Sequence, residues 1–142
     1  MSCLVDTSCL VALICSTHEH HERTRAELDA RVRRAEALAV SAHGLVETYA
    51  VLTRLPPPMR LTPVVAEAAL RAGWRRAQTI GLTAVETWSV LGGLPGRAVA
   101  GGRTYDALIA ACAKKAAVDT LLTWNTKHFE ALADGFAVAA PK

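Results

Sequence analysis

Five acidic side chains lie outside the strongly charged helical stretches of this sequence, and they are the residues best suited to do chemistry. They are Asp6, Glu47, Glu86, Asp106 and Asp119. Carboxylates that cluster repel each other, so a cluster is costly unless a cation gathers it. Oxygen-only ligands of this kind suit Mg²⁺ or Mn²⁺. The central question is which of these acids meet in the folded chain.

Asp6 stands out because it ends an apolar run, and Asn125 ends a similar one. The segment 2–6 (SCLVD) is typical of a short strand buried on both faces of a parallel sheet, and 118–125 (VDTLLTWN) is a second strand that ends in a polar residue. In parallel sheets, ligands bind outside the carboxyl ends of the strands, where the strand order reverses. We therefore expect Asp6 and Asn125 to form a pair at that edge.

The other acids have competing interpretations. Asp106 opens an otherwise apolar helix, where the helix dipole alone favours a carboxylate. Glu47 lies on the narrow polar stripe of a largely apolar helix, and that stripe faces either solvent or a polar cleft. Glu86 fits a capping box with Thr83. Asp119 fits a strand-entry position, at the end of its strand opposite Asn125.

The histidines are less specific. The segment 18–22 (HEHHE) opens a charged helix and lacks a zinc-binding pattern such as HExxH, so we expect a solvated helix start. His43 and His128 fall at loop-to-helix junctions near Glu47 and Asn125, where they can hydrogen-bond or touch a substrate.

The elements that must position these residues alternate along the chain. Strands are expected at 2–6, 37–41, 79–82, 118–125 and 136–140. Helices are expected from about 9, and at 17–37, 42–55, 62–77, 83–94, 103–117 and 126–133. Thr7 with Ser8, Thr17 and Thr62 are the expected N-caps of the first, second and fourth helices. This alternation predicts an α/β fold with a mostly parallel sheet.

The composition predicts one domain over residues 1–142, with 51% hydrophobic and 20% charged residues. No apolar stretch is long enough to cross a membrane, and the start lacks a basic n-region, so a cytoplasmic protein is expected. The four cysteines include no CxxC pair and are interpreted as small buried residues. A net charge of +3 permits an anionic partner without demanding one.

Four segments in register carry a family resemblance. They are LVDTSCLVAL, LVETYAVLTRLP, GGRTYDALIAACA and LLTWNTKHF, and together they span nearly the whole chain. In order and spacing they resemble a PIN-domain protein and, more narrowly, a VapC-type toxin ribonuclease of a bacterial toxin–antitoxin pair. The resemblance implies a three-layer α/β/α sandwich around a mostly parallel central sheet.

The resemblance also implies an acidic catalytic centre. Its metal ligands would be Asp6, Glu47 and Asp106, with Asn125 at the fourth catalytic position. The implied cofactor is Mg²⁺, for which Mn²⁺ can substitute, and its chemistry would be to activate a water that hydrolyses an RNA phosphodiester bond. Because Asn125 brings no charge, a second ion would arrive only with RNA.

Supporting roles follow from the same resemblance. Thr7 and Thr123 would support the acids. Separately from the resemblance, the positions of Arg54, Arg103 and Lys127 near the suspected acids predict contacts with RNA phosphates.

The partners implied by the resemblance are RNA, a second copy in a homodimer and a cognate antitoxin that would also tie the complex to operator DNA. Val64, Val65 and Leu70 offer an apolar surface for a partner. Two alternatives remain: a catalytically inactive PIN fold used as an interaction module, and a phosphoacceptor receiver-like domain. A receiver would need paired acids after its first strand and an acceptor Asp near mid-chain, and neither is present.

Overall fold

A central sheet of five parallel strands organises the chain, and the computed structural model describes all residues from 1 to 142. The strands are β1 (Ser2–Val5), β2 (Ala37–Ser41), β3 (Gln78–Ile80), β4 (Thr120–Leu122) and β5 (Ala137–Ala139). Their order across the sheet is β3-β2-β1-β4-β5, and every pairing is parallel. The chain moves outward from β1 through β2 to β3 and then crosses to β4 on the other side of β1. The strand order therefore reverses between β1 and β4, where parallel sheets open a crevice at their carboxyl ends.

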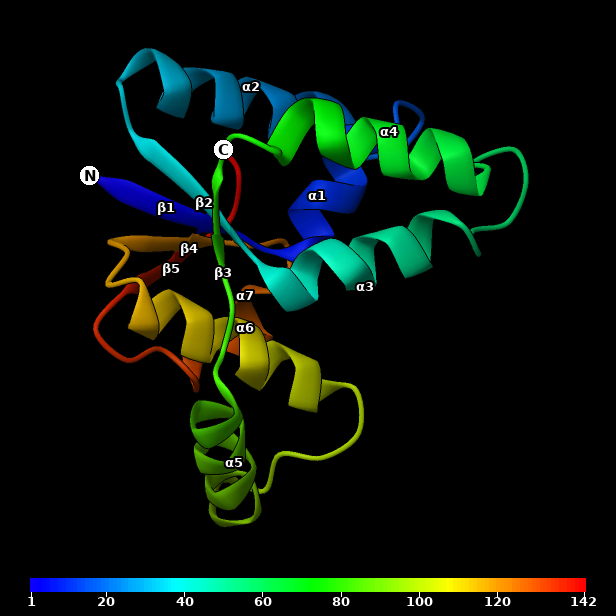
Figure 1. Cartoon of the computed structure of the whole chain (residues 1–142). Helices are drawn as coiled ribbons and strands as arrows, with labels where there is room; N and C mark the ends of the chain where they lie inside the picture. The colour runs from blue at the N-terminus through cyan, green and yellow to red at the C-terminus, as the bar shows by residue number, and fades with distance from the viewer.

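Helices cover both faces of this sheet. They are α1 (Thr7–Ile14), α2 (His21–Arg33), α3 (Ala42–Leu52), α4 (Pro63–Trp74), α5 (Ala84–Gly93), α6 (Arg103–Lys115) and α7 (Thr126–Glu130), with a short 3₁₀ helix at Pro95–Arg97. In Figure 1 the sheet lies between α1, α2 and α4 on one side and α5 and α6 on the other. This arrangement confirms the expected α/β fold with helices on both faces of a parallel sheet, and the sheet is entirely parallel.

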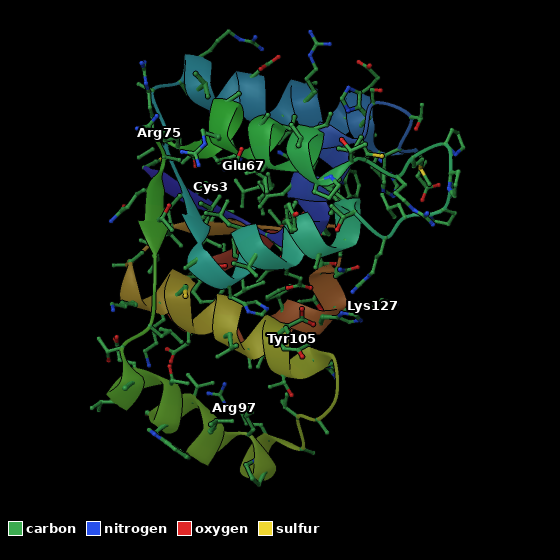
Figure 2. The ribbon with its side chains drawn as sticks, turned by 45° about the vertical axis from the view of Figure 1, so that its right-hand side comes forward. Cys3, Glu67, Arg75, Arg97, Tyr105 and Lys127 are labelled. Carbon is green, nitrogen blue, oxygen red and sulfur yellow. The ribbon has the colours of Figure 1, made fainter.

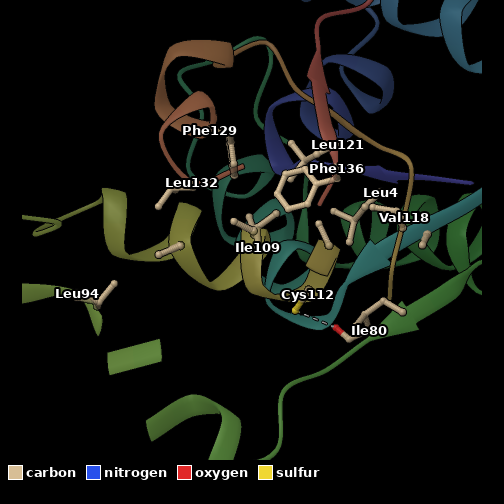
Figure 3. Close-up of a cluster of buried hydrophobic side chains, with 14 residues drawn as sticks. Leu4, Ile80, Leu94, Ile109, Cys112, Val118, Leu121, Phe129, Leu132 and Phe136 are labelled. Carbon is tan, nitrogen blue, oxygen red and sulfur yellow. Dashed lines mark hydrogen bonds between the residues drawn. The ribbon is translucent and has the colours of Figure 1, made fainter. Parts of the chain in front are cut away.

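Alternating side chains of the strands divide the core between the two faces. Successive residues of a strand point to opposite sides, so Cys3 and Val5 pack with Leu10 and Leu28 of α1 and α2. Leu4, between them, packs in a second cluster with residues of α6 and α7. Figure 3 shows this second cluster, in which Phe129, Leu132, Ile109 and Leu121 lie together. Both faces of β1 are thus buried, as the unbroken apolar run predicts.

The cysteines are buried and free, as their spacing predicts. Cys112 of α6 donates a weak hydrogen bond from Sγ to the carbonyl of Ile80, at 3.6 Å (Figure 3). Burial raises the pKa of the Cys112 thiol to about 11. A thiol with such a pKa is a poor nucleophile at neutral pH, so Cys112 acts as a packing group.

Two expected helix starts are wrong. The second helix begins at His21 instead of near Thr17, and its N-cap His20 makes no side-chain capping bond. The first helix begins at Thr7, and its N-cap is Asp6, whose carboxylate accepts from the Ser8 amide at 3.4 Å. The sequence pattern favours Thr7 and Ser8 because hydroxyl residues are common N-caps, but the Asp6 carboxylate, one residue earlier, accepts the capping hydrogen bond instead.

Other local predictions are confirmed. Thr62 caps α4, with its hydroxyl accepting from the Val65 amide. Thr83 and Glu86 form the reciprocal capping box at the start of α5.

None of the helices combines the length and apolar character that a membrane crossing requires.

Candidate active site

Asp6 lies at the carboxyl end of β1, in the crevice between β1 and β4. Its backbone amide donates to the carbonyl of Leu122 at 2.9 Å, which continues the pairing of the two strands. Its carboxylate Oδ2 accepts from Thr123 Oγ1 at 2.8 Å and from Ser8 Oγ at 2.9 Å. The residue is only 3% exposed. Burial raises the pKa of this carboxyl, and the hydroxyl donors oppose that rise.

Hydroxyl groups fix this carboxylate in place. Thr123 Oγ1 and Ser8 Oγ also lie 3.2 Å apart. Because each hydroxyl has a single proton, this contact is not a further hydrogen bond while both groups donate to Asp6. The backbone amide of Trp124 donates to Ser8 Oγ at 2.9 Å, and that of Asn125 donates to Thr123 Oγ1 at 3.0 Å. Thr123 was expected to support the acids, whereas Ser8 was expected only as a helix cap. The network couples the start of α1 to the segment after β4.

Glu47 projects from the second turn of α3, the helix that Ser41 caps through the Gly44 amide. Its Oε2 accepts from Thr7 Oγ1 at 3.3 Å. Nε2 of His43, one turn earlier, lies 3.1 Å from the same oxygen without forming a well-aligned hydrogen bond. The Glu47 side chain is 30% exposed, and it lines a polar cavity together with Asp6. Of the two interpretations left open by the helical pattern, the cleft is the one observed.

Asp106 lies in the first turn of α6. Burial and then the negative charge of Asp6 raise the pKa of its carboxyl. His128 of α7 places Nδ1 3.3 Å from Asp106 Oδ2. The Arg103 guanidinium in turn donates to the carbonyl of His128 at 3.3 Å. Asp106 therefore does more than cap its helix, because it is electrostatically coupled to an acid on another element.

One cavity joins these residues. Its volume is about 390 Å³, and it is lined by Asp6, Thr7, Ser8, Val11, His18, Glu19, His20, Glu47, Val51, Asp106, Trp124 and Asn125. The four expected catalytic positions are thus brought to the same cleft from β1, α3, α6 and the segment after β4. Their roles there remain predictions.

The donors in this cavity fit a hard cation by their chemistry. Burial and then the negative charge of Asp6 raise the pKa of Asp106, and a divalent cation would relieve the repulsion between the two carboxylates. No three acidic, histidine or cysteine side chains are arranged closely enough to enclose an ion by themselves. Mg²⁺ commonly uses one or two carboxylates and keeps several waters. The cavity fits that mode of binding better than a closed cage of protein ligands.

The expected phosphate-binding residues are not all at the cavity. Arg103 lies at the start of α6 and reaches α7 beside Asp106. Arg54 is exposed after the end of α3, and Lys127 lies on α7. None of Arg54, Arg103 and Lys127 lines the cavity itself. Figure 2 shows Lys127 on α7 and Tyr105 on α6, on the same side of the molecule.

The expectation of a solvated start for the histidine-rich segment is wrong for part of it. His18 and His20 are half-buried and, with Glu19, form part of the cavity wall. The ring of His20 stacks on Trp124, with centroids 3.9 Å apart and planes 12° from parallel. Nothing local in the sequence signals this contact, because Trp124 is contributed by the far end of the chain.

A second cavity of about 490 Å³ lies between α5 and α6. Its lysines are already paired, Lys114 with Asp134 and Lys115 with Glu86. Apolar side chains form half of its lining. It is the larger cavity but lacks a convergent set of free polar groups, so the acidic cleft is the better candidate for chemistry.

Comparison with known proteins places the sequence and the fold of this chain in one family. The family model described as "PIN domain" matches residues 3–135. Ribonuclease VapC40 of Mycobacterium tuberculosis is 40% identical over 125 residues, which cover 88% of this chain and 87% of the relative.

Solved structures resemble the fold over nearly the whole chain. M. tuberculosis VapC20, a sarcin–ricin loop cleaving toxin, superposes with a TM-score of 0.72 at 20% identity, covering 94% of this chain and 97% of the other. VapBC2 from Rickettsia felis, bound to a DNA fragment from its promoter, gives a TM-score of 0.70 at 18% identity, covering 99% and 98%.

Proposed function

The chain belongs to the PIN domain family, in its VapC branch, and on that premise we propose that it is a metal-dependent endoribonuclease that acts as the toxin of a toxin–antitoxin pair. The observation that carries the proposal is the convergence of Asp6, Glu47 and Asp106 on one cavity at the switch point of a parallel sheet. RNA as the substrate is supported by the 40% identical relative, which is named a ribonuclease.

Asp6, Glu47 and Asp106 are the residues that would hold Mg²⁺, or Mn²⁺ in its place. When bound, such an ion supplies Lewis acidity toward the scissile phosphate and its attacking water. Asp6 is the fixed point of the set, because Thr123 and Ser8 orient its Oδ2. The Thr7 hydroxyl donates to Glu47. The imidazole of His43 lies 3.1 Å from Glu47, and that of His128 lies 3.3 Å from Asp106.

Two further groups complete the site. Asn125 lines the cavity without adding charge, so its amide can orient a water or an RNA oxygen. The positive charge of Arg103 acts on Asp106, and Arg103 is the first candidate to contact an RNA phosphate. Arg54 and Lys127, which lie outside the cavity, would contact phosphates farther along the strand.

An antitoxin is the proposed protein partner. The Rickettsia felis structure is described as VapBC2 bound to promoter DNA, which supports contact with DNA through a complex and not through this chain alone. Val64 and Val65 are exposed on α4, and that surface is suited to an apolar partner. A homodimer of this chain is part of the same proposal.

Cleavage of a panel of structured RNAs by the purified protein tests the enzymatic proposal. The reaction is run with Mg²⁺, with Mn²⁺ and with EDTA, for the parent chain and for Asp6→Asn and Asp106→Asn. Asp119→Asn is the matched control, because Asp119 sits at the opposite end of the sheet and bonds to the Ser2 amide. We expect metal-dependent cleavage that the control retains and the two site variants lose.

Cleavage that persists in EDTA or in both site variants would contradict the proposal. Absence of cleavage together with absence of Mg²⁺ binding by calorimetry would favour the remaining alternative, an inactive PIN fold that serves as an interaction module. The receiver-like alternative loses support, because the sequence and the family model both match PIN proteins over nearly the whole chain.

A further inference from the structure

Three neighbouring aromatic rings lie in the wall of the acidic cavity, where His20 stacks on Trp124 and His18 lies tilted against His20. The ring centroids of His20 and Trp124 are 3.9 Å apart, and those of His18 and His20 are 5.6 Å apart with a tilt of 44°. Trp124 is the inner end of this His18–His20–Trp124 stack, and it packs against the apolar cluster beside α1 and α2. His18 is the outer end, and all three residues line the cavity.

Hydrogen bonds hold the stack rigidly. Trp124 Nε1 donates to Thr24 Oγ1 at 2.9 Å, and the Thr24 hydroxyl donates to the His20 carbonyl at 2.7 Å. The backbone amide of His20 donates to Nδ1 of His18 at 3.0 Å. This bond requires an unprotonated Nδ1, so the His18 ring carries its proton on Nε2. The guanidinium of Arg23 lies 5.1 Å from the centroid of the Trp124 ring. Each ring therefore has a defined orientation before any ligand enters.

The stack is also placed at a fixed position relative to Asp6. The backbone amide of Trp124 donates to Ser8 Oγ, and Ser8 Oγ donates to Asp6 Oδ2, each at 2.9 Å. Two hydrogen bonds thus connect the aromatic wall to the carboxylate that is proposed to hold the metal ion. A nucleotide whose phosphate lies at Asp6 would have its base or its neighbour's base within reach of this wall.

None of these three rings has a role in the proposed hydrolysis. The charged groups beside the stack are Arg23, over the Trp124 ring, and Glu19, 3.5 Å from His20 Nε2, and neither is one of the expected catalytic residues. Burial and the charge of His20 lower the pKa of His18, which favours the uncharged form of its ring. Unpaired bases bind proteins by stacking on aromatic side chains, histidine included.

We propose that the His18–His20–Trp124 stack is a nucleobase subsite, in which a base adjacent to the scissile phosphate stacks on the ring of His18. His18 would then be a specificity-determining residue that selects unpaired nucleotides next to the cut. The inference rests on the proposed ribonuclease function, since it assumes that the cavity accepts RNA.

Binding of short, fluorescently labelled single-stranded RNAs to the full chain tests this subsite. All proteins carry Asp6→Asn, which prevents cleavage during the measurement. His18→Ala removes the ring, His18→Phe keeps a ring without a donor, and His18→Asn keeps a donor without a ring. Trp88→Ala is the matched control, because Trp88 is an exposed aromatic residue on α5 away from the cavity. A second set of RNAs carries one abasic nucleotide, moved along the strand.

The expected order of affinity separates stacking from hydrogen bonding. Stacking of one base contributes about 1–3 kcal/mol, so His18→Ala and His18→Asn should bind about 5- to 150-fold more weakly, toward the low end for a small ring. His18→Phe and Trp88→Ala should bind as the parent does. One abasic position should weaken binding to the parent and to His18→Phe, yet leave binding to His18→Ala unchanged, because the base has lost its partner there.

Four outcomes would overturn the inference. If His18→Phe binds as weakly as His18→Ala while His18→Asn binds like the parent, His18 acts as a donor and not as a stacking surface. If every variant responds alike to the abasic series, the stack has no role in binding, although the nuclease proposal stands. If the Asp6→Asn parent binds no RNA while the chain with Asp6 intact cleaves the RNA panel, the inference fails and the proposed function stands. If the first binds no RNA and the second cleaves none, both fail.

Discussion

At the scale of single residues, Asp6 shows a conflict between folding and chemistry. Its carboxylate is 3% exposed, and burial raises its pKa, so the ionised form that a metal requires is the form that the fold disfavours. Two hydroxyl donors and the start of α1 offset part of this cost. A residue kept charged against its environment is typical of a functional site, where stability is exchanged for reactivity.

The first prediction concerns Asp6→Asn. The asparagine oxygen can still accept from Ser8 and Thr123, but the buried charge is gone. A group whose folded-state pKa is raised stabilises the fold fully below its unfolded pKa, and that stability is lost as pH rises through the folded pKa. At pH 7 and without divalent cations, Asp6→Asn should therefore melt at a higher temperature than the parent and be inactive.

Calorimetric melts at a series of pH values check this prediction. The difference by which Asp6→Asn melts at a higher temperature than the parent should become smaller as pH falls and the parent carboxyl becomes protonated. Asp6→Ala is the matched control, because it removes the charge together with the acceptor and the helix cap, and it should gain less or lose stability. An Asp6→Asn protein that melts lower than the parent at every pH would contradict the argument.

The second prediction concerns Thr123, which is fully buried and donates to Asp6. Thr123→Val keeps the shape but leaves the carboxylate and the Asn125 amide without this hydroxyl. Hydrogen bonds to charged groups contribute about 1.5–3 kcal/mol, so the free energy of unfolding should fall by that order, and cleavage should fall with it. Thr123→Ser retains the hydroxyl and should retain activity. Urea titration and cleavage rates measure the two effects.

At the scale of elements, the start of α3 determines where Glu47 lies. Ser41 caps this helix by accepting from the Gly44 amide at 2.8 Å. A Cβ at position 44 would lie 2.7 Å from Ser41 Oγ and 3.5 Å from Thr7 Oγ1. The helix that presents Glu47 can therefore begin in this way only where residue 44 lacks a side chain.

The third prediction is a pair of glycine substitutions. Gly44→Ala should displace the Ser41 cap, which contributes about 0.5–2 kcal/mol, and should lower both the free energy of unfolding and activity. Gly73→Ala, in α4, meets no atom within 4 Å and should stabilise by about 0.5–1 kcal/mol, because alanine is the better helix former. Denaturant titration of both variants checks this. Equal changes in the free energy of unfolding for the two variants would contradict this prediction, because they would show that the close contact at position 44 relaxes without loss of stability.

The fourth prediction concerns α5, which has no buried residue of its own. Glu86 links it to the body, because hydrogen bonds from Lys115 and from the Thr83 backbone lower the pKa of its carboxyl from 4.5 to about 2. A lowered pKa gives stability that is present above the unfolded value and lost as pH falls through the folded one. The parent should therefore be more stable than Glu86→Gln at pH 6. This difference should vanish toward pH 2, as followed by circular dichroism.

Sequence patterns could predict these elements because the signals are local. The apolar run before Asp6, the capping box at Thr83 and the cap at Thr62 each lie within a few residues, and each was confirmed. The role of His18 and His20 could not be read in this way. Their partner Trp124 is adjacent only in the folded chain, and the charged residues around them are equally typical of a solvated helix start.

At the scale of the whole molecule, the strand order explains why acids from distant segments meet. Because the strand order reverses between β1 and β4, the crevice at that point receives Asp6 from the end of one strand and Asn125 from the segment after the other. α3 and α6 add Glu47 and Asp106 from opposite faces of the sheet. The carboxylate charge is thereby concentrated at one edge of a protein whose net charge is +3. An anionic RNA would meet repulsion there unless a cation were bound.

The fifth prediction follows from this concentration of charge. A ligand that binds only the folded state raises its stability by RT ln(1 + [L]/Kd), or about 2.7 kcal/mol at one hundred times Kd. Mg²⁺ should therefore raise the melting temperature of the parent and of Asp119→Asn, but not that of Asp6→Asn. In EDTA, Asp6→Asn should have the higher melting temperature than the parent. Added Mg²⁺ should therefore reduce the difference in melting temperature between the two proteins or reverse its sign. A melting temperature of the parent that does not respond to Mg²⁺ or Mn²⁺ would mean that the acids remain a purely structural cluster. The inactive interaction module would then be the better description of this chain.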